Sequence, residues 1–171
     1  PVVRLRVALS WDGEPVPLEE QVTLDIVGHE RHLALRVDAP FFGDPAPDFP
    51  PGSVPGLWNY EVVELFIAGA EGRYLEVEIG PHGHHLVLQL DGVRNVVEQG
   101  LELDLEVSRG DVRWTARASL PRDWLPPLPH RVNAYSVHGA GEHRRYLAAN
   151  AVPGDGPDFH RLQYFREVRL P

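Results

Sequence analysis

Cysteine, lysine and methionine are all absent from the 171-residue sequence, and the first two absences each remove a class of chemistry. Without cysteine the chain can form no disulfide, no thiolate nucleophile and no cysteine-ligated zinc site. Without lysine it can form no Schiff base and has no lysine general base. Its sixteen basic residues are therefore all arginines.

Long apolar runs and positive charge are also scarce. No apolar stretch reaches the roughly 18 residues that span a bilayer, and no basic start followed by an apolar segment marks a signal peptide. The net charge is −9 and the pI is about 5.4. Such an acidic chain repels the phosphates of nucleic acid and of anionic membranes. We therefore expect a cytoplasmic protein without a nucleic-acid or membrane partner.

Alternation of apolar and polar residues recurs along the chain, and 43% of the residues are hydrophobic, enough for a sizeable core. The alternating runs lie near residues 3–9, 22–26, 33–37, 60–68, 73–80, 84–91, 101–108, 111–119, 131–138 and 143–149. At most one helical turn is expected, near 121–125, where Pro126 would stop it. About ten short strands predict an all-β fold, an antiparallel β-sandwich of jelly-roll or immunoglobulin-like type. No linker or repeat divides the chain, so we expect one domain over residues 1–171.

One connection is unusually long. Residues 40–57 hold six prolines and three phenylalanines. Long connections without regular structure often border binding sites, and proline lowers the entropic cost of ordering them. Trp58 and Tyr60 follow directly, where the loop meets the sheet. Aromatic rings of this kind can stack on the apolar faces of sugars, so we expect them on the rim of a site. Trp58 could equally serve only to anchor the loop.

Three glutamates are expected on one face of two neighbouring strands. The apolar residues of 60–68 and 73–80 should turn towards the core, which leaves Glu64 and then Tyr74, Glu76 and Glu78 on the opposite face. Carboxylates this close are unfavourable unless they are solvated, neutralised or paired with cations. The face is therefore either the wet outer side of a sandwich or a concave site for a small polar ligand.

Further candidates for this face come from the later strands. The return strand 84–91 would add His85, and the strand 131–138 would add Tyr135. Arginines that could neutralise the glutamates are Arg117 on the strand 111–119 and Arg145 on the strand 143–149. Strand order does not follow from the sequence, so the pairing of arginines with glutamates stays open.

The turn PHGHH raises the question of a metal site. Adjacent residues on a strand point to opposite faces, so His84 and His85 cannot easily chelate one ion together. His82, His84 and His160 are the candidates for metal ligands, but no HExxH or other ligand spacing is present. Hydrogen-bonded turn histidines are the alternative that we favour. We assign no catalytic residue, because no GxSxG or similar motif frames a nucleophile.

Several segments carry a resemblance to a known family. LWNYEVVELFI, YLEVEIGPHGHHLVLQLDGVRN and PDFHRLQYF resemble an uncharacterised protein family, known by an open-reading-frame label, that is shared by animals and bacteria. WDGEPV and APFFGDPAP fit the same family, so the resemblance covers nearly the whole chain. More distantly, the chain is similar to family 9 carbohydrate-binding modules and DOMON-like domains. Four motifs carry that similarity: Val63-Glu64, Tyr74-x-Glu76-x-Glu78, Pro81-x-Gly83 and Phe159-His160.

The wider resemblance implies two antiparallel sheets with a ligand face for sugars or, in some DOMON domains, for haem. Haem held by methionine and histidine is excluded because the chain has no methionine. The calcium site of family 9 modules cannot be traced to residues here, so calcium or another divalent metal stays open and no cofactor is assigned. We predict a non-catalytic binding protein for a small polar, carbohydrate-like ligand. The alternatives are a metal-assisted hydrolase or other enzyme using histidine and glutamate on the same face, and a protein-interaction module.

Overall fold

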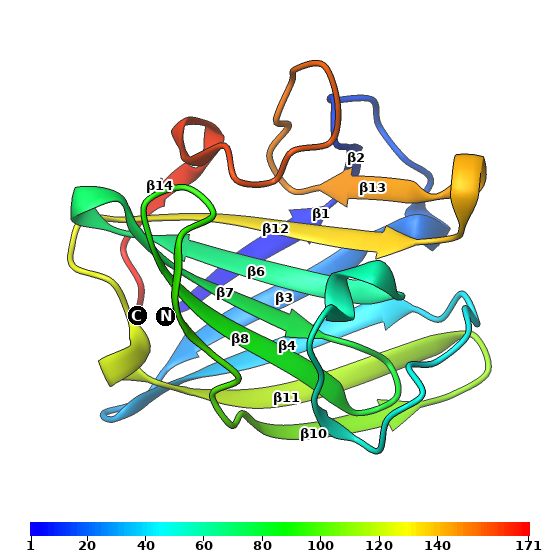
Figure 1. The fold of residues 1–171 in the computed structure, drawn as a ribbon, viewed down its shortest axis with the longest axis horizontal. Coiled ribbons are helices and arrows are strands. Elements are labelled where there is room, and N and C mark those ends of the chain that lie inside the picture. Colours follow the sequence, from blue (N-terminus) through cyan, green and yellow to red (C-terminus); the bar gives the residue numbers. More distant parts are fainter.

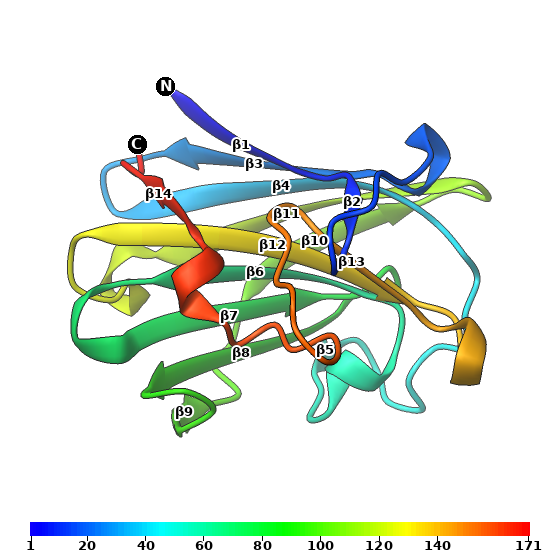
Figure 2. The same cartoon turned by 90° about the horizontal axis from the view of Figure 1, so that it is seen from above.

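The computed structural model describes residues 1–171 and contains two β-sheets that pack face to face (Figure 1). Figure 2 shows the two layers from above, with β1, β3 and β4 in one and β12, β6, β7 and β8 in the other. All strand pairs are antiparallel except β5 with β8. The predicted all-β antiparallel sandwich is confirmed.

The five-stranded sheet has the order β1-β3-β4-β11-β10. Its strands are β1 (Val2–Val7), β3 (Val22–Gly28), β4 (His32–Pro40), β11 (Arg113–Pro121) and β10 (Asp104–Arg109). Inward apolar residues alternate with outward polar ones, and the burial pattern of β11 follows that period of two. One face of this sheet is therefore buried and the other is open to water.

The nine-stranded sheet has the order β2-β13-β12-β6-β7-β8-β5, with β14 beside β12 and β9 beside β8. Its long strands are β12 (His130–His138), β6 (Val62–Ala68), β7 (Arg73–Ile79) and β8 (His84–Asp91). Its short strands are β2 (Leu9–Ser10), β13 (Arg145–Ala148), β5 (Gly52–Ser53), β9 (Val96–Gln99) and β14 (Arg166–Val168). The sequence did not indicate β2, β5, β9 or β14 as separate strands, because two to four residues are too few to show a period.

The helical turn expected near 121–125 is present as a 3-10 turn, η4 (Arg122–Trp124). Five further 3-10 turns lie in connections and were not indicated by the sequence. They are η1 (Leu18–Glu20), η2 (Leu57–Asn59), η3 (Ala70–Gly72), η5 (Gly141–His143) and η6 (Leu162–Tyr164). None of these three-residue segments has the length and apolar character needed to cross a membrane.

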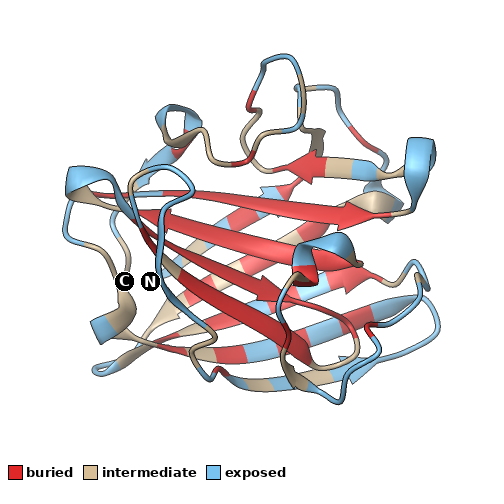
Figure 3. Cartoon of the chain, viewed as in Figure 1, coloured by how far each residue is buried: buried red, intermediate tan, exposed pale blue.

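The nine-stranded sheet is buried on both faces. Between the sheets lies a cluster of 25 buried residues, which includes Leu75, Val77 and Ile79 of β7 as expected. A second cluster of 14 residues covers the opposite face and includes Phe66, Tyr135 and Phe159. Figure 3 shows the consequence, since β6, β7, β8 and β12 are coloured as buried along almost their whole length. The face that carries the glutamates is therefore roofed by loops and is not a wet outer wall.

Candidate functional site

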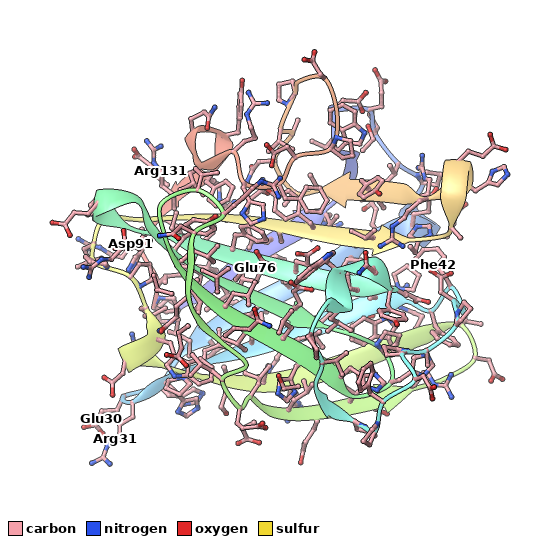
Figure 4. All side chains as sticks on the ribbon, viewed as in Figure 1. Glu30, Arg31, Phe42, Glu76, Asp91 and Arg131 are labelled. Carbon is pink, nitrogen blue, oxygen red and sulfur yellow. The ribbon has the colours of Figure 1, made fainter.

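Glu64, Glu76 and Glu78 converge on the roofed face of the nine-stranded sheet. Glu64 is paired directly with Glu78 across β6 and β7, and Glu76 lies two residues before Glu78 on the same face. One carboxylate oxygen from each of the three residues lies within 4.8 Å of the other two. The exposed fractions are only 3%, 3% and 0% for Glu64, Glu76 and Glu78. Figure 4 shows Glu76 over the middle of the sheet, away from its edges.

These carboxylates lack the partners that buried acids normally have. Glu76 Oε1 and both oxygens of Glu78 are buried without any hydrogen-bond partner. Burial raises the pKa of Glu64 and of Glu78 well above the ordinary range, and the negative charges of the neighbouring glutamates raise both further. Arg144 lowers the pKa of Glu64, but less strongly. The cluster therefore places buried carboxylate oxygens that accept no hydrogen bond at the centre of the sheet.

His160 faces the same cluster from the C-terminal segment. Its Nε2 lies 3.7 Å from Glu76 Oε1, and its Nδ1 lies 2.7 Å from the hydroxyl of Tyr74. That hydroxyl oxygen accepts a hydrogen bond from the backbone N–H of Arg94, so its own proton is directed to His160 Nδ1. Neutral His160 then carries its proton on Nε2, towards Glu76. Burial lowers the pKa of His160, which favours this neutral ring.

Above the cluster is a cavity of about 380 Å³, here called the acidic cavity. Half of its fourteen lining residues are hydrophobic, and the rest include two arginines. The lining residues are Trp58, Asn59, Glu64, Glu76, Leu88, Leu90, Arg94, Val96, Val137, Arg144, Tyr146, Pro157, Phe159 and His160. An apolar wall with a few convergent polar groups, of this size, is typical of small-molecule sites.

Arg144 is a wall residue of the acidic cavity with a fixed position. Its guanidinium donates to the carbonyl oxygens of Gly139 at 2.9 Å, Trp58 at 2.7 Å and Tyr60 at 3.3 Å. The guanidinium also lies 5.7 Å from the centre of the Tyr146 ring. No carboxylate forms an ion pair with it. Arg144 therefore ties two loops together and brings an unpaired positive charge to the cavity.

Arg94 holds the opposite wall. It has a φ of 60°, in the left-handed region that non-glycine residues rarely adopt. Its side chain pairs with Asp158 at 2.7 Å, and its backbone N–H binds the Tyr74 hydroxyl at 2.9 Å. This strained turn therefore connects the segment beyond β8 with the His160 segment.

Arg117 and Arg145, which were expected to neutralise the glutamates, lie outside the acidic cavity. Arg117 is exposed on the outer face of the five-stranded sheet, beside Glu106 and Arg36. Arg145 is exposed on β13 and pairs with Glu20 at 3.1 Å. Neither lines the acidic cavity. Arg117 is separated from the site because its strand, β11, belongs to the five-stranded sheet. The turn η5 ends just before Arg144, which places Arg144, rather than the adjacent Arg145, at the wall of the acidic cavity.

The interpretation of His85 as part of the polar face is wrong. His85 shares its face of β8 with Val87, which belongs to the cluster between the sheets. His85 Nε2 accepts the backbone N–H of Leu103 at 3.3 Å. The register pairs His85 with Ile79, whereas Leu86, Leu88 and Leu90 are paired with Glu78, Glu76 and Tyr74 and lie on the glutamate side. His85 is therefore structural.

The other predicted aromatics lie near the acidic cavity but in different roles. Trp58 is 46% exposed and lines it. Tyr60 is half-buried against the apolar cluster on this face. Tyr135 lies beneath Phe159, with ring centres 3.8 Å apart, and donates its hydroxyl proton to the Phe159 carbonyl at 2.9 Å. Tyr135 and Tyr74 thus support the site from below.

His82 and His84 are separate from the acidic cluster. His84 Nε2 lies 2.8 Å from the carbonyl oxygen of Phe49, and His82 packs edge-on against Phe41. Both histidines therefore contact the long loop 40–57. His84 has the hydrogen bond expected of a turn histidine, whereas His82 Nε2 is buried without a partner. Of the three metal candidates only His160 reaches the glutamates.

Sequence reasoning missed Arg94, Arg144, Phe159 as a wall residue, and Glu61. Phe159 stood in the quoted Phe-His pair, but nothing indicated that its segment folds over the sheet. Glu61 is 6% exposed and accepts the backbone N–H groups of Phe42 at 2.9 Å and Asp44 at 3.1 Å. Its position just before a strand of alternating residues was the one available signal. It anchors the long loop beside the site.

The comparisons with known proteins agree with this architecture. A crystal structure from Bacteroides uniformis ATCC 8492, described as a "putative carbohydrate-binding protein", matches 97% of this chain and 84% of its own with a TM-score of 0.72. The sequences are only 16% identical, so the likeness is one of fold. No family model matches the chain.

Sequence relatives are found among vertebrate proteins. The rat UPF0462 protein C4orf33 homolog is 43% identical over 170 residues, which cover 94% of this chain and 85% of the relative. Human UPF0462 protein C4orf33 is 42% identical over 174 residues, which cover 96% and 87%. The zebrafish homolog is 42% identical over 170 residues, which cover 94% and 86%. These three relatives are all from animals, so the expected sharing of the family with bacteria stays a prediction. By this identity over nearly its whole length, the chain belongs to the UPF0462 (C4orf33) family.

Proposed function

We propose that this protein binds a small polyhydroxylated, carbohydrate-like ligand in the acidic cavity. The observation that carries the proposal is the pair of glutamates that line the cavity, Glu64 and Glu76, with Glu76 Oε1 buried and without a hydrogen-bond partner. Buried polar groups are normally hydrogen-bonded, and those that are not call for an explanation. Ligand hydroxyls, each of which is a donor, would satisfy these acceptors.

The walls of the acidic cavity support the same class of ligand. Sugars present apolar C–H faces between their hydroxyl groups, and aromatic rings can pack against such faces. Trp58, Tyr146 and Phe159 line the cavity. The unpaired guanidinium of Arg144 adds a donor for ring or hydroxyl oxygens. The carbohydrate-binding description of the similar bacterial structure points in the same direction, although fold alone does not determine function.

The test is a thermal-shift and calorimetric screen of the whole chain with neutral mono- and disaccharides. Trp58→Ala and Arg144→Gln should each weaken binding of any hit at least tenfold, because each removes a wall group. Arg145→Gln is the matched control, since Arg145 is the adjacent arginine outside the acidic cavity. A folded protein that binds no saccharide at millimolar concentration, or equal losses in Arg144→Gln and Arg145→Gln, would contradict the proposal.

The contact of His160 with Glu76 favours a second candidate, an enzyme that transfers protons to the same class of ligand. Histidine oriented by one partner and directed at a carboxylate is a common acid–base arrangement. The two functions are separated by recovering the saccharide after incubation. An unchanged saccharide supports binding, whereas conversion that His160→Gln abolishes supports catalysis.

A further inference from the structure

The three glutamates at the base of the acidic cavity have no counter-charge in the protein. The only ionisable group of opposite type within ion-pair distance of any of them is His160, whose ring lies 3.7 Å from Glu76 and is favoured in its neutral form by burial. Arg144, the nearest arginine to act on Glu64, gives its N–H groups to three backbone carbonyls. Taking a carboxylate out of water costs several kcal/mol, in order of magnitude, unless a partner compensates it. The three carboxyl groups are therefore neutralised either by protons or by a cation from outside the chain.

Glu78 is the clearest case in the cluster of a carboxyl group without a partner. Its side chain is fully buried and both of its oxygens lack any partner. One of these oxygens lies within 4.8 Å of a carboxylate oxygen of Glu64 and of Glu76. A solvated acidic patch would leave such oxygens in contact with water. A structural glutamate would have backbone or side-chain donors, as Glu61 has in the N–H groups of Phe42 and Asp44. Glu78 has neither, so its oxygens are placed for a ligand.

We propose that Glu64, Glu76 and Glu78 form a binding site for one hard divalent cation, with Ca²⁺ as the best fit. Carboxylate oxygens are the ligands that Ca²⁺, Mg²⁺ and Mn²⁺ prefer. Ca²⁺ binds oxygens at about 2.3–2.6 Å, so ligands on opposite sides of the ion lie about 4.6–5.2 Å apart. The three glutamates offer oxygens within 4.8 Å of one another, which is no farther apart than two ligands of one Ca²⁺ can lie. Mg²⁺, at about 2.0–2.1 Å, would require a tighter set.

His160 shapes the site without joining the coordination shell. Its Nδ1 accepts the Tyr74 hydroxyl proton, which leaves the proton on Nε2 directed at Glu76. The separation of 3.7 Å is too long for a hydrogen bond, so His160 acts on the Glu76 carboxylate only as an outer-shell neighbour. The shell therefore contains oxygen only, which favours Ca²⁺ over Zn²⁺.

The open positions of the cation face the acidic cavity, because Glu64 and Glu76 line it while Glu78 lies beneath. Neighbouring hydroxyls of a bound saccharide would complete the coordination shell, and only this last step rests on the proposed function. Two central strands carry all three ligands, so the site is held on rigid elements.

The experiment is a calorimetric titration of chelator-treated full-length protein with Ca²⁺, Mg²⁺, Mn²⁺ and Zn²⁺ in turn, without saccharide. We expect one Ca²⁺ per chain, bound more tightly than Mg²⁺ or Zn²⁺, and a higher melting temperature with Ca²⁺. Glu78→Gln, which keeps the shape of the side chain, should weaken Ca²⁺ binding at least tenfold. Glu98→Gln is the matched control because Glu98 is exposed on β9 of the same sheet.

Three results would overturn the cation site: no uptake of Ca²⁺ by folded protein at millimolar concentration, tighter binding of Zn²⁺, or equal affinity in Glu78→Gln and Glu98→Gln. A saccharide titration in chelator and in Ca²⁺ separates this inference from the proposed function. Saccharide binding with no Ca²⁺ uptake sinks the cation site alone. Ca²⁺ uptake with no saccharide binding in either buffer sinks the proposed function alone.

Discussion

At the scale of single residues, the protein keeps groups that folding by itself would not select. Glu78 is fully buried on the central strand β7, with neither oxygen hydrogen-bonded and with Glu64 directly opposite. An apolar or amide side chain of similar shape would cost less in the unliganded state. Functional sites are where such locally unfavourable choices are expected.

Glu78→Gln should therefore stabilise the protein at pH 7.5 in the presence of chelator. The substitution removes a buried carboxyl group beside two others, so we expect a gain of roughly 1–3 kcal/mol, the usual scale for a buried group without a partner. Urea unfolding of wild type and variant measures the change. A loss of stability of similar size would mean that Glu78 has a partner in the folded protein that the contacts above do not include.

At the scale of elements, the long loop 40–57 is held to the sandwich by a small number of polar anchors. The Glu61 carboxylate accepts the N–H groups of Phe42 and Asp44, and Asp44 in turn accepts the N–H of Gly139 at 2.7 Å. Burial raises the pKa of Glu61 and outweighs these hydrogen bonds, which act to lower it. The loop and the β12–β13 hairpin are thereby joined beside the acidic cavity.

Glu61→Gln should loosen this loop while leaving the sheets intact. The amide keeps one acceptor oxygen where the carboxylate has two, so one backbone N–H loses its charged partner, at a cost of about 1.5–3 kcal/mol. We expect hydrogen exchange at the amides of Phe42 or Asp44 to become at least tenfold faster. Glu19→Gln, at an exposed glutamate of η1, serves as the control. Uniform acceleration across the strands would instead show global destabilisation.

At the scale of the whole molecule, the nine-stranded sheet has a buried cluster of side chains on each of its faces. The nine-stranded sheet buries one face against the five-stranded sheet and the other against loops and the acidic cavity. His85 lies on the side between the sheets, where its Nε2 accepts the Leu103 N–H and burial lowers its pKa below the usual 6.5. Protonation of Nε2 would turn this acceptor into a donor that faces the Leu103 N–H, so the hydrogen bond would be lost.

This placement makes stability depend on pH. Between the lowered pKa of His85 in the folded protein and 6.5 in the unfolded chain, the unfolded state binds more protons, so the His85 contribution falls as the pH falls. The urea midpoint of wild type should therefore drop more between pH 7.5 and pH 5.5 than that of His85→Gln. His143→Gln, at an exposed histidine, should keep the wild-type slope. An equal change of the urea midpoint with pH in all three proteins would contradict the assignment of this effect to His85.

The alternation of side chains could be followed from the sequence because it is a local property of a strand. Leu75, Val77 and Ile79 face the core, and Glu64, Glu76 and Glu78 therefore share the opposite face. The all-β class follows from the same pattern repeated along the chain. The Trp58 rim could also be placed, since it follows directly from the proline-rich loop.

Only the tertiary structure decided what meets that face. Whether the glutamates stand in water or under a roof depends on segments far away in the chain, such as those carrying Arg94 and Phe159. The choice of Arg144 over Arg145 and Arg117 depends on where a turn ends and on strand order. The inward direction of His85 depends on the register of β8 against β7. Residue periodicity is encoded within a few neighbours, whereas strand order and loop coverage result from long-range packing, which no local pattern records.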